Sequence, residues 1–356
     1  MIPRRIIVTV LIAFLCVESI SMAQTEPENS ARKDVVSYAG PMKALDLQQL
    51  VDRSELIIVA EVTRLLDSPG EYIREQSVNQ AKLYAAEVTV REVLKGNLQP
   101  GKIVVGGLLP IRSVDRKNNG PLKPDMVRIF FLVREQNSWR FADPFFGVLI
   151  AAPVTPRPTV ASISDKVMEQ LFAALRSNLV STDEKRILIS YFRASSDSRI
   201  VPALKAELEK PQDEALTNAL LAELISRNDR DALVKARNII ATSNSKEVGI
   251  LFYSLARLNR PELLPDITAG LRSQNRAVRW MAATALADSR LPEADPPLLA
   301  LLDDPDRHLV TQVMISLAGK YKQPEWAPYM DDDKKWDDML QHWRQFRDSR
   351  EAKAGH

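Results

Sequence analysis

The chain has 356 residues, of which 45% are hydrophobic, with a formal net charge of +2 and a single cysteine. This length is enough for two domains, each with its own core. The near-neutral balance gives no electrostatic reason to expect nucleic acid as a partner, and one cysteine excludes a disulfide within the chain.

The first 23 residues have the pattern of a signal peptide. Arg4 and Arg5 form a basic start, residues 6–17 are apolar, and residues 21–23 (Ser-Met-Ala) form a cleavage site. An apolar stretch this short spans a bilayer poorly, so cleavage after Ala23 is favoured over an uncleaved signal anchor. We therefore expect a secreted or periplasmic product that has no membrane span and no cysteine.

Residues 24–44 are polar and are expected to form a flexible leader, and residues 45–150 predict a small β-domain. A short helix is expected near Leu50 and Val51. Strands are expected at 56–62, 84–91, 102–105, 127–134 and 139–141. Short strands joined by turns, without a long helix between them, favour a small antiparallel barrel.

The second of these strands alternates cleanly. Its residues Tyr84, Ala86, Val88 and Val90 are expected to face the core. Lys95-Gly96 is interpreted as a turn in which glycine supplies a positive φ, the alternative being a ligand-binding loop. Four aromatic residues are expected mainly in the core, with a binding face as the alternative: Trp139, Phe141, Phe145 and Phe146.

Residues 54–62, 88–96 and 129–133 resemble netrin-like OB barrels, which include tissue inhibitors of metalloproteinases. The resemblance implies an OB fold and makes a ligand-binding or inhibitor-like role of this domain the alternative function. In those inhibitors an N-terminal cysteine chelates the protease metal. Here the expected mature N-terminus is Gln24 and no cysteine remains, so the resemblance does not extend to that chemistry.

Residues 151–164 contain three prolines and predict a semi-rigid linker, after which helical periodicity takes over. Residues 271–287 are repeated 31 positions later at 302–318, so that Leu286 corresponds to Leu317, and the register runs back to Leu224. A fixed period of this size predicts a helical solenoid over residues 165–320. Five helix pairs are expected at about 166–193, 198–226, 230–257, 261–288 and 293–319.

These repeats resemble short HEAT repeats of the kind found in bilin lyases, within the armadillo-like helical class. The resemblance implies a right-handed superhelix that binds proteins or peptides, and it brings no catalytic residue. A lyase role would need a chromophore partner and an intracellular setting, which the signal peptide disfavours. The overall expectation is an α+β multidomain chain: an OB-like barrel followed by a HEAT-like solenoid.

Residues 321–356 predict a final helix that caps the solenoid. Its aromatic stripe contains Trp336, Leu340, Trp343 and either Phe346 or Arg347, and the alternative is a docking helix for a partner. Solenoids need such a cap because one helix pair cannot bury both of its apolar faces.

The sequence contains few residues in the patterns typical of catalytic or metal-binding sites. His308, His342 and His356 are not at metal-ligand spacing, and residues 331–333 (Asp-Asp-Asp) lack the pattern of a calcium loop. No glycine-rich nucleotide loop and no nucleophile elbow is present. We therefore expect no catalytic residue, cofactor or metal, with an unrecognised hydrolase as a further alternative.

The expected function is that of a non-catalytic scaffold that binds a protein or peptide through its solenoid. Trp280 lies off the apolar stripe of its helix, and a solvent-facing Trp280 flanked by Arg276 and Arg279 would resemble a binding hot spot. Packing of Trp280 against the adjoining helix is favoured over this interpretation. The candidate binding residues are Trp280, Arg276, Arg279, Arg307 and His308.

Overall fold

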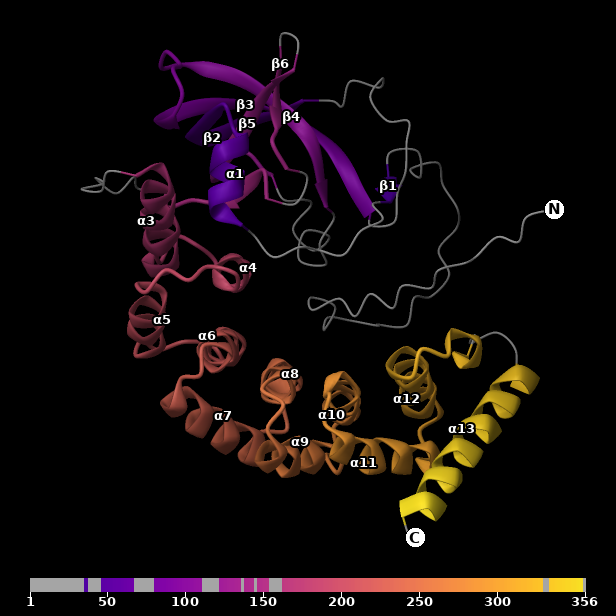
Figure 1. Cartoon of the computed structure of the whole chain (residues 1–356). Coiled ribbons are helices and arrows are strands. Elements are labelled where there is room, and N and C mark those ends of the chain that lie inside the picture. Colours follow the sequence, from indigo (N-terminus) through magenta and orange to yellow (C-terminus); the bar gives the residue numbers. More distant parts are fainter. Residues whose placement is uncertain are drawn as a thin grey trace, which may run out of the picture. The chain divides into compact units, whose positions relative to one another are not determined.

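The structure is a computed structural model that describes residues 35–37, 46–66, 80–110, 122–135, 138–143, 146–153, 162–328 and 333–354. The expected signal peptide, most of the leader and linker, and the residues Phe145, Asp331, Asp332 and His356 lie outside the described residues. The chain divides into two compact units between Lys210 and Pro211, and each is described by itself (Figure 1). The predicted domain boundaries remain predictions.

The first unit contains an OB-like β-barrel. Its elements are β1 (Val35–Ser37), α1 (Leu47–Arg53), β2 (Leu56–Leu66), β3 (Gln80–Lys95), β4 (Lys102–Pro110), β5 (Val127–Glu135), β6 (Ser138–Phe141) and β7 (Val148–Ile150). Each of the five predicted strands is present. The short strands β1 and β7 were not predicted; β1 pairs with β3, and β7 pairs with β5.

Five strands close the barrel in the order β3-β2-β5-β6-β4, and β4 returns to pair with β3. All of these pairs are antiparallel except β4 with β6, where Val105 lies opposite Trp139 in a parallel register. Strand directions cannot alternate all the way round a ring with an odd number of strands. One parallel pair is therefore required, and the predicted small barrel is confirmed with this single parallel seam.

The barrel core follows the alternation of the strands. Ala86 and Val88 are fully buried, and Tyr84 and Val90 pack against the same cluster, as predicted. Phe141 lies in the core, where its ring is 6.3 Å from that of Phe130. The core interpretation of the aromatic residues is thus confirmed for Phe141.

The turn after β3 is confirmed at Gly96, which has φ +88°. A Cβ atom there would lie 2.7 Å from the backbone oxygen of Glu55, so the close approach also demands glycine. Lys95 donates from Nζ to the backbone oxygen of Val51 at the end of α1, over 2.7 Å. Its amine therefore stabilises the end of a helix.

Three helices pack in the same unit as the barrel: α3 (Ile163–Arg176), α4 (Thr182–Phe192) and α5 (Ile200–Leu208). Ser181 and Glu184 form a capping box that begins α4. The amide of Gln170 in α3 donates to Glu92 of β3 over 3.0 Å. Polar contacts thus join these helices to the barrel.

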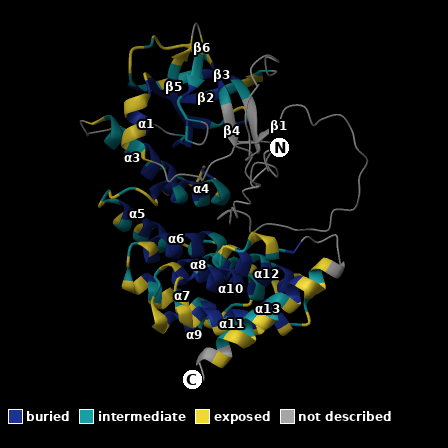
Figure 2. Ribbon diagram, turned by 45° about the vertical axis from the view of Figure 1, so that its right-hand side comes forward, coloured by how far each residue is buried: buried dark blue, intermediate teal, exposed yellow. Residues whose placement is uncertain are grey.

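The second unit is built from helix pairs, as the 31-residue period predicted. Its helices are α6 (Glu214–Ser226), α7 (Arg230–Thr242), α8 (Gly249–Arg257), α9 (Leu264–Gly270), α10 (Arg276–Asp288), α11 (Asp295–Ala300), α12 (Arg307–Lys320) and α13 (Asp333–Ala354). Short 3-10 turns introduce α8, α9 and α11. Figure 1 shows two layers: a first layer of α7, α9 and α11, and a second layer of α6, α8, α10 and α12. Figure 2 shows that the second layer is mostly buried along its length.

The pitch of 31 residues recurs in the caps of the second layer. Asp213, Asn275 and Asp306 each accept a backbone N–H at the start of a helix. The amide of Asn275 also donates to the backbone oxygen of Asn244, its equivalent one repeat earlier, over 2.8 Å. The caps therefore connect neighbouring repeats as well as begin helices.

The final helix, α13, packs on the last repeat. Trp343 is fully buried, and its Nε1 donates to the backbone oxygen of Trp326 over 3.0 Å. Arg344 and Arg347 both form ion pairs with Asp303, which precedes α12. The aromatic stripe of α13 thus covers apolar surface, and its arginines hold the loop between α11 and α12.

Candidate binding surface of the helical repeats

The candidate residues gather at the start of α10 and α12, around one carboxylate. Asp306 Oδ2 lies 2.8 Å from Nε of Arg276 and 3.5 Å from Nη2 of Arg279. The Asp306 side chain is 16% exposed, because it also caps α12 through the backbone N–H groups of His308 and Leu309. The structure therefore brings two predicted arginines of one repeat to the helix cap of the next.

The two arginines differ in how much of their charge is available. Arg279 is 21% exposed, and its Nη1 also donates to the backbone oxygens of Ser273 and Gln274, so that it stabilises the preceding loop. Arg276 is 55% exposed, and the one ion pair described above, with Asp306, is made through its Nε. Arg276 is the better candidate to meet a partner.

Arg307 has a contact that the repeat pattern did not predict. Its guanidinium lies over the ring of Trp336 from α13, 4.4 Å from the ring centre. The indole Nε1 of Trp336 donates to Oγ1 of Thr311 in α12, over 2.8 Å. A cation over an aromatic face is attractive, so the first turns of α13 and α12 stabilise each other.

Trp280 and His308 complete the surface. Trp280 lies one turn after Arg276 on α10 and is half-buried, so its side chain is neither fully packed nor fully exposed. His308 is exposed in the first turn of α12. Trp280 is thus partly exposed on the helix whose arginines, Arg276 and Arg279, share the carboxylate of Asp306.

Residues 217–318 match a family model of HEAT repeats. These helix pairs are HEAT repeats. Neither curated proteins nor solved structures gave a match. The HEAT repeats span α6 to α12, which includes both sides of the Asp306 cluster.

Two residues of the surface were missed as site residues, Asp306 and Trp336. The sequence carried a signal for both, because Asp306 is a residue of a type that caps helices and stands inside the repeated segment 302–318, and Trp336 belongs to the predicted stripe of the final helix. The sequence pattern did not predict the ion pair between Arg276 and Asp306, the helix cap thirty residues later. In a solenoid this pairing follows from the pitch, since equivalent caps of adjacent HEAT repeats are neighbours.

Within the described parts of the chain, no cluster of His, Cys, Asp and Glu has the composition of a metal site. Among the helices described, none is long and apolar enough to cross a membrane.

Proposed function

We propose that this chain is a non-catalytic scaffold whose HEAT repeats bind a protein or peptide through the surface formed by Trp280, Arg276, Arg307 and His308. The observation that carries the proposal is the half-buried Trp280 one helical turn after Arg276, an exposed arginine that shares the carboxylate of Asp306 with Arg279, on the second layer of the repeats. Tryptophan and arginine are enriched among the residues that dominate binding energy at interfaces.

The electrostatics favour an acidic partner. Two guanidinium groups, those of Arg276 and Arg279, share one carboxylate, Asp306, and that carboxylate also caps a helix. A partner carboxylate approaching Arg276 would form a charge-assisted hydrogen bond, which is stronger than one between neutral groups.

We further propose that this scaffold acts outside the cytoplasm, in the periplasm or the extracellular space, because residues 1–23 have the basic and apolar pattern of a signal peptide. Cell fractionation followed by N-terminal sequencing of the product tests this part. A mature N-terminus at Gln24 supports export, whereas a cytosolic product that retains Met1 contradicts it.

Binding is tested by capture with the full-length chain after crosslinking in the cell envelope. The wild type is compared with Trp280→Ala and Arg276→Ala, and with Glu293→Ala as the control, since Glu293 is exposed in the short turn before α11. A partner recovered by the wild type and the control but depleted with both site variants supports the proposal. Equal recovery by all four proteins contradicts it.

A further inference from the structure

Arg276 and Arg307 hold the same position in neighbouring HEAT repeats. They are 31 residues apart, and each is the first residue of a second-layer helix, α10 or α12. The starts of these helices lie side by side, because Arg276 reaches the Asp306 cap of α12 over 2.8 Å. Neighbouring helices pack with their axes roughly 8–10 Å apart, so the two arginines are about one such step apart along the repeats.

The two side chains lean in the same sense, which preserves this step. Arg276 leans towards α12, and Arg307 leans towards α13, which follows α12 along the solenoid (Figure 1). Arg276 is more than half exposed, and Arg307 is also exposed. The nearby carboxylate of Asp303 forms ion pairs with two arginines of α13.

Trp336 of α13 holds Arg307 in place. The guanidinium lies over the indole ring, and the ring is fixed by its hydrogen bond to Thr311. Thr311 is the equivalent in α12 of Trp280 in α10, so Trp336 places an indole on α12 at the position where α10 carries its own. Stacking uses the face of a guanidinium and none of its five N–H donors. The final helix thus contributes to the surface as well as capping the repeats.

We propose that the binding surface spans two repeats and takes an acidic segment in the polyproline II conformation, whose carboxylates, three residues apart, pair with Arg276 and Arg307. This conformation has three residues per turn and rises about 3.1 Å per residue. Side chains three residues apart therefore point the same way at a separation of about 9 Å, which matches the step between the helices. The inference rests on the proposed function and adds the spacing of the partner's charges to it.

The test compares two peptides of the same composition and charge by calorimetric titration into the full-length chain. The first, Gly-Ser-Glu-Pro-Pro-Glu-Ser-Gly amide, has the required spacing, and the second, Gly-Ser-Pro-Pro-Glu-Glu-Ser-Gly amide, has adjacent carboxylates. Low ionic strength is used because exposed ion pairs are then least screened. The spaced peptide is expected to bind about fivefold more tightly, since only it can form a charge-assisted contact with each arginine at once.

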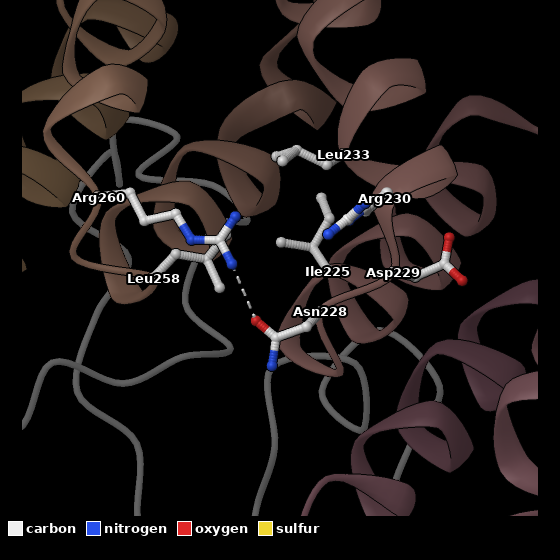
Figure 3. A pocket seen from close by; sticks show the side chains of 7 residues that line it. All are labelled: Ile225, Asn228, Asp229, Arg230, Leu233, Leu258 and Arg260. Atoms are coloured by element: carbon white, nitrogen blue, oxygen red, sulfur yellow. Dashed lines mark hydrogen bonds between the residues drawn. The ribbon is translucent and has the colours of Figure 1, made fainter.

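Protein variants locate the two contacts. Arg276→Ala and Arg307→Ala are each expected to lower the affinity ratio of the two peptides to about one, because a single arginine does not distinguish the spacing. The matched control is Arg260→Ala, an exposed arginine in the loop after α8, at the opposite end of the second-layer helices. Figure 3 shows Arg260 beside Asn228, to which it donates a long hydrogen bond of 3.4 Å. This control should keep the fivefold ratio.

The role of Trp336 is tested by the same ratio. Trp336→Ala should lower it towards one, whereas Trp336→Phe, which retains an aromatic face for the guanidinium of Arg307, should keep most of it. A general loss of stability affects both peptides alike and leaves their ratio unchanged.

Equal affinity of the wild type for the two peptides overturns the inference, as does no binding of the spaced peptide up to about 5 mM. A fivefold ratio that survives Arg307→Ala also overturns it. The comparison in the wild type needs no variant, so it holds if a substitution alters folding. Equal peptide affinities with intact, Trp280-dependent capture of a partner would remove only this inference. A fivefold ratio without such capture would instead remove the proposed partner site at Trp280.

Discussion

Arg128 in β5 donates a hydrogen bond from Nη2 to Oε1 of Glu184 in α4, over 2.6 Å. Glu184 also accepts from the backbone N–H and the hydroxyl of Ser181, which completes the capping box of α4. One carboxylate thus determines both where α4 begins and where it lies on the barrel. The first helices are joined to the barrel by a shielded ion pair, in which Arg128 is 8% exposed.

Replacing Arg128 with alanine is expected to lower the free energy of unfolding of this unit by about 2–4 kcal/mol, because it leaves the Glu184 carboxylate partly buried without its cation. Urea unfolding followed by circular dichroism measures the change. The matched control is Arg64→Ala, whose ion pair with Glu87 is longer, at 3.7 Å, and more exposed. The control should cost less than about 1 kcal/mol, and equal losses would contradict the importance of the junction.

The same pair predicts a dependence on pH. Burial raises the pKa of Glu184. The charge of Arg128 and the hydrogen bonds from Ser181 lower this pKa by more than burial raises it, so that the net pKa lies below 4.5. A carboxyl whose pKa is lowered on folding contributes stability above its unfolded pKa and loses it as the pH falls through the folded value. The wild type should therefore have a larger free energy of unfolding than Glu184→Gln at neutral pH, and this difference should shrink as the pH falls below about 4.5. A difference that stays constant down to acid pH would refute this assignment.

Gly270 allows two layers of the HEAT repeats to approach each other. A Cβ atom there would lie 2.5 Å from Cζ of Phe252 and 2.9 Å from Cβ of Ala282. Gly270→Ala is expected to destabilise the unit by about 1–3 kcal/mol through overpacking. Gly319→Ala, at an exposed position in α12, should instead be neutral or stabilising by up to about 1 kcal/mol. Thermal unfolding of both variants measures these changes. Stabilisation by Gly270→Ala would contradict tight packing of Gly270 against Phe252 and Ala282.

Trp343 is the main anchor of α13. Its side chain is fully buried and its Nε1 is hydrogen-bonded, so Trp343→Ala should cost about 3–5 kcal/mol and expose apolar surface of the last repeat. Gln345→Ala, on the exposed face of the same helix, should change the stability by less than about 0.5 kcal/mol. Unfolding and light scattering report stability and aggregation. Similar behaviour of the two variants would argue that α13 does not cap the repeats.

Local patterns predicted most of the elements, because the forces that form them are local. The apolar spacing along α10 and α12 repeats every 31 residues, and the caps Asn275 and Asp306 repeat with it. Clean alternation from Tyr84 to Val90 likewise identified the core face of β3.

Partners distant in sequence could not be predicted in this way. The parallel seam of Val105 with Trp139 and the pairing of Arg128 with Glu184 join residues that no local period relates. The site shows the same division. Arg276 and Trp280 were recognisable by type and position, but the exposure of Trp280 depended on packing between helices, and the structure leaves it half-buried.

The claim that the HEAT repeats bind through the surface around Trp280 is tested most directly by calorimetric titration of a captured, purified partner into the full-length chain. Wild type, Trp280→Ala and Glu293→Ala are compared after their folding is verified by thermal unfolding. We predict that Trp280→Ala raises the Kd by about thirtyfold, the equivalent of about 2 kcal/mol, while Glu293→Ala leaves it unchanged. The same Kd for all three proteins, within about twofold, would contradict the account.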